Sequence, residues 1–183
     1  GNSRGPPDIC RRVIRRGGLR PFSGVPTRLH GRMGRMSVSE VHEVALDRLR
    51  RVDQRYTRNR RLVVELLATA AAPSTISELL ERNAVLAQSS TYRNLTVLEE
   101  AGVVSRIITG DNHARFELTE DVTGTHHHHL VCTGCGIVLD VTLPAPVEDA
   151  LQEALFGAAA ANGFVGEHHR VDLVGHCAAC GEA

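Results

Sequence analysis

The first sustained hydrophobic pattern of the chain begins near Ser39 and has the spacing of an α-helix. Ser39 is a suitable N-cap for this helix, because its hydroxyl can accept a hydrogen bond from an unpaired amide of the first turn. A second helix is predicted after Thr57, ending before Pro73, whose ring cannot continue a helix. The apolar positions are Val41, Val44, Ala45, Leu49 and Val52 in the first helix and Leu62, Val63, Leu66, Leu67 and Ala70 in the second.

Two shorter helices and a hairpin complete the first unit of the chain. The third helix is predicted from residue 75 or 76 to about residue 82, and the fourth from about residue 89 to Gly102. The stretch VVSRIITGDNHARFEL then predicts two short strands joined by a turn at residues 110–112. This order of helices and hairpin is typical of a winged helix-turn-helix domain, which we expect over residues 37–119.

Residues 126–183 are predicted to form a second, small α+β unit, joined to the first by a hinge at residues 120–125. The stretches HHLVC, GIVLDVTL and FVGEHHRVDLVGHC have the character of strands. Between the last two, apolar residues at helical spacing predict a helix that two prolines precede and Gly163 follows. A unit of this size has little core of its own, so we expect a staple or a partner to stabilise it.

The arginines are concentrated near the N-terminus. Residues 1–61 hold 16 of the 21 arginines and only 5 acidic residues, whereas the remainder holds 5 arginines and 16 acidic residues. Such a separation is typical of a protein with one half that faces nucleic acid and another that attracts cations. Residues 1–36 are rich in Gly, Pro and Arg and are predicted to be a disordered basic tail, in which Met33 or Met36 is a candidate start.

The composition predicts a globular, cytoplasmic protein. Hydrophobic residues make up 42% of the chain, yet no apolar run is long enough for a membrane helix or a signal peptide. No Ser-His-Asp, Cys-His or HExxH arrangement stands out, so we do not expect an enzyme.

Four cysteines form two Cys-x-x-Cys pairs, Cys132 with Cys135 and Cys177 with Cys180. Two such pairs can supply the four thiolates of a tetrahedral zinc site, and four protein ligands leave no open position for catalysis. A thioredoxin-like redox motif is the alternative, but two matched pairs at the two ends of one small unit favour metal. The spacing therefore predicts a structural Zn²⁺ ion.

Four consecutive histidines precede the first cysteine pair. Because alternate side chains of a strand point to opposite faces, we expect His126 and His128 on one side and His127 and His129 on the other. The run can therefore contribute to two sites of mixed nitrogen and oxygen donors, which suit Fe²⁺, Mn²⁺, Zn²⁺, Co²⁺ or Ni²⁺. A solvated patch that binds metal weakly is the alternative. The further donors in this half are Glu117, Asp140, Glu148, Glu167, His168 and His169.

Several motifs occur together in the order and spacing of a known family. They are YTRNRRLVVELL, SSTYRNLTVLEEAGVVSR, RFEL, the histidine run, LVCTGCG and HHRVDLVGHCAAC. Over about residues 40–181 the chain resembles the ferric uptake regulator family of bacterial metal-dependent repressors. The resemblance implies a homodimer in which each subunit joins a winged helix to a C-terminal α+β dimerisation domain, and double-stranded operator DNA as the partner.

The resemblance also implies roles for individual residues. The four cysteines match the structural zinc ligands of the family, and a regulatory hinge site is implied at Glu117, His127, His129 and Asp140. An additional site is implied at His126, Glu148 and His169, to which strand alternation adds His128. DNA contacts are implied at Arg60, Tyr92 and Arg93, with Gln88, Ser89 and Ser90 at the start of the fourth helix as further candidates.

Departures from the family pattern bear on which metal is sensed. Members that sense iron or peroxide carry a His just before the third helix, where this chain has Pro73 or Ser74. Zinc-sensing members tend to carry an Asp in the first wing strand and a Cys near the end of the second, where this chain has Ser105 and Thr119. Iron and zinc therefore both stay open.

Together these features predict a metal-responsive repressor of metal-ion homeostasis that binds palindromic operators as a metal-loaded dimer. Besides the structural zinc it would hold a regulatory Fe²⁺, Zn²⁺, Mn²⁺ or Ni²⁺ ion. A peroxide- or nickel-responsive regulator of the same family is one alternative. A metal-storage or chaperone protein is an alternative from another class, although such a protein has no need of the fourth helix or the wing.

Overall fold

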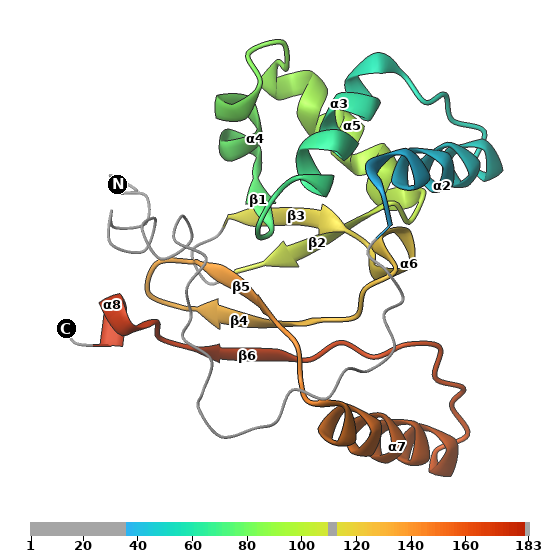
Figure 1. Cartoon of the computed structure of the whole chain (residues 1–183), viewed down its shortest axis with the longest axis vertical. Helices are drawn as coiled ribbons and strands as arrows, with labels where there is room; N and C mark the ends of the chain where they lie inside the picture. The colour runs from blue at the N-terminus through green and yellow to red at the C-terminus, as the bar shows by residue number, and fades with distance from the viewer. Residues whose placement is uncertain (1–35, 110–112, 182–183) are drawn as a thin grey trace.

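Within the described residues, the N-terminal unit contains four helices and a small sheet (Figure 1). The computed structural model describes residues 36–109 and 113–181, so nearly all of the predicted basic tail and the predicted hairpin turn lie outside the described residues. The elements lie close to those predicted from the hydrophobic pattern. They are α2 (Val38–Arg51), α3 (Arg58–Ala68), α4 (Ile76–Arg82), α5 (Gln88–Glu100), β2 (Val104–Ile108) and β3 (Ala114–Leu118).

Hydroxyl side chains determine where three of these helices begin. Ser37 Oγ accepts a hydrogen bond from the Glu40 amide, and the Glu40 carboxylate accepts one from the Ser37 amide at 2.7 Å. The prediction of Ser39 as the N-cap is wrong, because Ser37 is the residue with a glutamate three positions later to complete a capping box. Thr57 caps α3 as predicted, and Thr75 caps α4.

The core of the N-terminal unit lies between the helices and a three-stranded sheet. Leu49, Val63 and Leu98 are completely buried in it, and Phe116 of β3 is 2% exposed. The sheet has the order β1-β3-β2, in which β1 (Ser74–Thr75) is a short strand that the sequence did not predict. Strand β3 therefore lies in the middle of the sheet, paired antiparallel to both neighbours.

The C-terminal unit contains a second sheet of order β5-β4-β6. Its strands are β4 (His128–Cys132), β5 (Val138–Val141) and β6 (Asp172–Gly175), with β5 antiparallel and β6 parallel to β4. The predicted helix is α7 (Ala145–Ala161), which stands apart from the sheet in Figure 1, and a short α8 (Ala178–Gly181) follows β6. Within the described ranges, no helix combines the length and apolar character needed to cross a bilayer.

The last strand is shorter than predicted. Glu167, His168 and His169 precede β6 and lie in no strand. The parallel register pairs His129 with Asp172, and β4 begins at His128, so the residues before β6 have no strand beside them to pair with.

The predicted hinge contains a helical turn, α6 (Glu120–Thr123), that packs on the N-terminal unit. Val122 is completely buried in the core, and the Met36 amide donates to the Thr123 carbonyl oxygen at 3.2 Å. Arg48 of α2 forms an ion pair with Asp121 at 3.2 Å. The segment is therefore anchored to α2. The chain leaves α6 at Gly124, whose φ of 71° suits glycine, and continues to β4.

The wing hairpin contacts the C-terminal unit directly. Ile107 of β2 packs with Val131 of β4 and Val138 of β5 in a small buried cluster. The buried Arg115 side chain donates from Nε to the Gly136 carbonyl oxygen at 2.5 Å. The wing hairpin therefore lies against the C-terminal sheet (Figure 1).

Candidate metal centres

The four predicted cysteines meet at one point. Cys132 is the last residue of β4, Cys135 lies in the turn between β4 and β5, and Cys177 and Cys180 follow β6. Their Sγ atoms all lie within 4.8 Å of one another, and Cys135 Sγ is 3.8 Å from Cys177 Sγ. Because the edges of a tetrahedron with Zn–S bonds of about 2.3 Å are about 3.8 Å long, this spacing fits a four-thiolate zinc site.

The surroundings of the cysteines bear on whether the four thiols can ionise and bind a cation. Burial raises the pKa of the Cys132 thiol, but backbone hydrogen bonds from Cys177, Cys135 and Gly134 outweigh burial and lower the pKa to about 6. The hydrogen bond to Cys177 raises the pKa of Cys180 to about 11, so a cation is needed to ionise the whole set. A Cβ atom at Gly134 would lie 2.9 Å from the Cβ of Cys180, so only glycine allows this approach.

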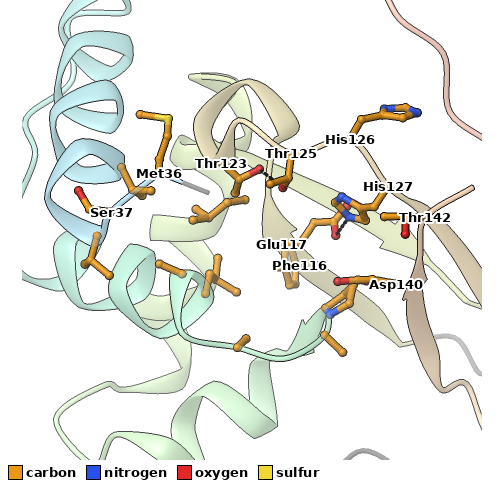
Figure 2. Close-up of a pocket in the computed structure, with 18 residues that line it drawn as sticks. Met36, Ser37, Phe116, Glu117, Thr123, Thr125, His126, His127, Asp140 and Thr142 are labelled. Carbon is orange, nitrogen blue, oxygen red and sulfur yellow. Dashed lines mark hydrogen bonds and ion pairs between the residues drawn. The ribbon is translucent and has the colours of Figure 1, made fainter. Parts of the chain in front are cut away.

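A second cluster joins the wing to the C-terminal sheet. Glu117 Oε2 lies 3.1 Å from Nε2 of His127 and 3.2 Å from Nε2 of His129. Asp140, which the β4–β5 register places opposite His129, completes a set of four donor atoms within 4.8 Å of one another. Figure 2 shows Glu117 and His127 directed toward each other. We call Glu117, His127, His129 and Asp140 the hinge-side cluster.

The hinge-side cluster pairs a carboxylate with imidazolium groups. Burial raises the pKa of Glu117, but its hydrogen bonds with His127 and His129 outweigh burial and lower the pKa to about 2. The same hydrogen bond raises the pKa of His127 to about 9. Burial lowers the pKa of His129, yet its bond to Glu117 makes the net shift upward. A metal ion at this cluster must therefore displace protons.

A third cluster surrounds Glu148, in the first turn of α7. Glu148 Oε1 lies 3.1 Å from His126 Nε2 and 2.9 Å from His169 Nε2, and Oε2 lies 2.8 Å from His128 Nε2. Although it is buried and close to the carboxylate, His169 Nε2 has no hydrogen bond. A cation between these donors would satisfy that nitrogen. We call His126, His128, Glu148 and His169 the α7 cluster.

The side chains of the four consecutive histidines alternate between two clusters, although only His128 and His129 belong to β4. His126 and His128 face Glu148 on one side, and His127 and His129 face Glu117 on the other. The structure thus brings together the residues of each predicted ligand set. The further donors considered at positions 167 and 168 belong to neither cluster.

Two carboxylates that were not predicted contact the Nδ1 atoms of cluster histidines, on the side of the ring away from the cluster. Asp172 Oδ1 lies 3.0 Å from His129 Nδ1, and Glu120 Oε2 lies 2.7 Å from His126 Nδ1. Histidines that bind metal usually donate their second ring N–H to such a group, which fixes the tautomer. The contact of Asp172 with His129 follows from the pairing of β4 with β6. The one signal for it in the sequence is that an acidic residue interrupts the apolar stretch VDLVG.

A cavity of about 470 Å³ opens beside the hinge-side cluster (Figure 2). Apolar side chains of α2 and α3 line one end, and Glu117, His127 and Asp140 line the other. Pro73 lies in its wall, and Ser74 pairs with Phe116 in the sheet. The position at which iron-sensing members carry a histidine therefore borders this space without supplying a nitrogen donor.

The sequence and this fold both have counterparts among known proteins. A model of the ferric uptake regulator family matches residues 51–174. The chain belongs to the ferric uptake regulator family. One relative in this family, the peroxide operon regulator of Bacillus subtilis, is 30% identical over 149 residues, which cover 79% of this chain and 96% of that protein. The ferric uptake regulation protein of Bordetella parapertussis is 34% identical over 110 residues, covering 60% of this chain and 73% of that protein.

Solved ferric uptake regulators share the fold. That of Helicobacter pylori, described as having three functional metal binding sites, aligns with a TM-score of 0.63 at 20% identity over 82% of this chain and 99% of its own. That of Vibrio cholerae aligns with a TM-score of 0.57 at 25% identity over 72% of this chain and 98% of its own. As a member of the ferric uptake regulator family, the chain is a metal-responsive, DNA-binding transcriptional regulator.

Most of the candidate DNA contacts of this family member lie together on α5. Tyr92 is 53% exposed, and a hollow between α4 and α5 is lined by Ile76, Ser77, Gln88, Ser89, Tyr92 and Arg93. Ser90 turns its hydroxyl back to the Ala87 carbonyl oxygen at 2.9 Å. Arg60 does not line this hollow, and its guanidinium donates to the Arg55 carbonyl oxygen and to Gln54. Arg60 therefore supports the loop before α3.

Proposed function

We propose that the chain is a homodimeric repressor of metal-ion homeostasis, which binds a palindromic operator when a divalent ion occupies the hinge-side cluster. Residues 37–119 would bind DNA, residues 120–125 would form the hinge, and residues 126–183 would form the dimerisation domain. The observation that carries the proposal is the contact of Glu117, on the second wing strand, with His127 and His129 of the C-terminal unit. One ion bound there would hold both units.

The four cysteines are proposed to bind a structural Zn²⁺ ion. The chain between the two pairs forms β5, α7 and β6, and no residue of α7 or β6 is buried. A unit with so little core needs the stability that a four-thiolate site contributes. The set is closed, so this zinc would not respond to signals.

The regulatory ion is proposed to be a borderline or hard divalent cation. The hinge-side cluster offers two imidazoles and two carboxylates and no sulfur. Such donors suit Fe²⁺, Mn²⁺, Zn²⁺ or Ni²⁺, and the same donors at the α7 cluster suit the same ions. Iron and zinc remain the two leading candidates.

Metal would act by shifting a population of conformations. An ion that binds Glu117 together with His127 and His129 favours the arrangement in which the wing lies against the C-terminal sheet. In a dimer this arrangement would hold two α5 helices at the spacing of two operator half-sites. Tyr92 and Arg93 would then contact bases and phosphates in the major groove.

A second copy of the chain is the partner proposed for the C-terminal unit. Val147 and Leu155 of α7 are 50% and 40% exposed, and Leu173 and Val174 of β6 are 67% and 60% exposed. Exposed apolar side chains on two elements of the same unit favour an interface with another subunit. Sedimentation of the zinc-loaded protein tests this: a monomer at micromolar concentration would contradict the dimer.

The regulatory role is tested by operator binding on protein that retains its cysteine-bound zinc. Chelator-treated protein is titrated with Fe²⁺, Mn²⁺, Zn²⁺ and Ni²⁺, and DNA binding is followed by fluorescence anisotropy. Replacing His127 and His129 with Ala should abolish the response to metal while zinc remains at the cysteines. His168→Ala is the matched control, because this exposed histidine belongs to neither cluster. An unchanged response in the double variant would exclude the hinge-side cluster as the sensor.

A further inference from the structure

Glu120 contacts two neighbouring histidines at once. It is the first residue of α6, and Oε2 lies 2.7 Å from Nδ1 of His126. The other oxygen, Oε1, accepts a hydrogen bond from the backbone amide of His127 at 3.0 Å and lies 3.8 Å from Nδ1 of the same residue. One carboxylate therefore contacts both residues along their shared stretch of backbone.

The two histidines belong to different clusters. The Nε2 atom of His126 faces Glu148 at 3.1 Å, and the Nε2 atom of His127 faces Glu117 at 3.1 Å. Figure 2 shows His127 turned toward Glu117 and His126 turned away from both. The Glu120 carboxylate therefore contacts one histidine of each cluster.

The contact with His126 has the geometry that a metal-binding histidine needs. When Nδ1–H donates to Glu120, Nε2 is left without a proton and its lone pair faces the α7 cluster. Carboxylates in this position fix the tautomer and orientation of the ligand, and their loss typically lowers metal affinity about 10- to 100-fold. On the other side, the bond to the His127 amide fixes the backbone from which that imidazole reaches Glu117.

We propose that Glu120 is a positioning residue shared by the α7 cluster and the hinge-side cluster, and that it couples their occupancy. The inference rests on the proposed function, in which both clusters bind metal. An ion at the α7 cluster holds His126, and through it Glu120, in one arrangement. The entropy of ordering the Glu120 side chain and the His127 backbone is then already lost when the second ion binds, which favours that second event.

Repulsion between two divalent ions opposes this coupling, so the contribution of Glu120 has to be isolated by a double-mutant cycle. The isolating variant is Glu120→Gln. Its amide oxygen can still accept the His127 N–H, whereas its NH₂ group cannot accept the proton of His126 Nδ1. Asp121→Asn is the matched control, because Asp121 is the neighbouring acid on α6 and pairs with Arg48 instead of a histidine.

The experiment measures Co²⁺ affinity by competition with a chelator, on full-length protein that retains its cysteine-bound zinc. Absorption bands of bound Co²⁺ report the geometry of each cluster. Coupling is the factor by which His169→Ala, which removes one α7-cluster ligand, changes affinity at the hinge-side cluster. Coupling between two binding sites is reciprocal. If the α7 cluster binds the second ion, the same factor is obtained from the effect of His129→Ala on Co²⁺ affinity at the α7 cluster. The factor is determined in the wild type, in Glu120→Gln and in Asp121→Asn.

The expected result is a coupling factor at least about fivefold more favourable in the wild type and Asp121→Asn than in Glu120→Gln. Glu120→Gln should also alter the Co²⁺ spectrum of the α7 cluster, which a role confined to the turn would leave unchanged. Equal coupling factors in all three proteins would overturn the inference. Failure of the wild type to bind Co²⁺ at either cluster would instead refute the proposed function. If Glu120→Gln does not fold, Glu120→Asp gives the same test, since its shorter side chain cannot span both histidines.

Discussion

Metal binding at the hinge-side cluster is expected to release protons near neutral pH. With a pKa of about 2 for Glu117 and about 9 for His127, a carboxylate faces an imidazolium at pH 7 when no ion is bound. A metal ion binds only neutral imidazole, so His127 must lose its proton before it becomes a ligand. The ion pair therefore competes with the metal.

The size of this competition follows from the pKa of His127. At pH 7, two units below a pKa of about 9, only about 1% of the imidazole is neutral. The apparent metal affinity should therefore be about 100-fold lower at pH 7 than well above the pKa, and should rise about tenfold for each pH unit in between. Glu117 is ionised throughout this range and adds nothing to the slope. His129, whose pKa is also raised, makes the slope steeper.

Competition of Mn²⁺ between the protein and a chelator, from about pH 6.5 to about pH 8.5, measures this slope. Release of protons into a weakly buffered solution, followed with an indicator dye, gives an independent count of about one or more per ion. The control variant His168→Ala should retain the wild-type slope. An affinity that is constant over this range, with no proton released, would refute the protonated state of His127 and the reasoning from its ion pair.

Three further predictions concern other parts of the molecule. Gly134→Ala places a Cβ atom 2.9 Å from that of Cys180, so zinc should be lost to chelators faster and the melting temperature should fall; unchanged zinc content would contradict this. Arg93→Ala should weaken operator binding and reduce the slope of log affinity against log salt by about 0.9 if the side chain contacts phosphate, as anisotropy at several salt concentrations would show. Thr75→Ala removes the hydroxyl that accepts the Glu78 amide at 3.2 Å, so the free energy of unfolding in urea should fall by about 1 kcal/mol while metal affinity stays the same.

The N-terminal unit could be predicted closely because its signals are local. Helical spacing of apolar residues, a hydroxyl at a helix start and Gly102 after α5 each act within a few residues of the chain. The error at Ser39 arose because two serines compete for one cap, and the glutamate that decides between them pairs with Ser37. The helical turn α6 escaped prediction because four residues hold too little periodicity, and buried Val122 is the tertiary contact that stabilises it.

The candidate ligands were predictable for a different reason. Alternation along a strand predicts that His126 and His128 are separated from His127 and His129. The structure keeps this separation, although β4 begins only at His128. Glu120 and Asp172 could not be found in this way, because their roles depend on the turn after α6 and on the register of β6 against β4. Metal ligands can be recognised in the sequence from their residue types and spacing. The residues that orient those ligands can be recognised only from the tertiary structure.

Strand β3 connects the hinge-side cluster to the core of the N-terminal unit. Its side chains alternate, so Phe116 and Leu118 are buried in the core of the N-terminal unit, while Arg115 and Glu117 extend to Gly136 and to the histidines of the C-terminal unit. An ion that restrains Glu117 would thus restrain the backbone of a strand whose other face packs against α3 and α4. Under the proposed function, closure at the cluster would move α5 together with the wing, and the ion would add its binding energy to the contacts that Ile107 and Arg115 already provide.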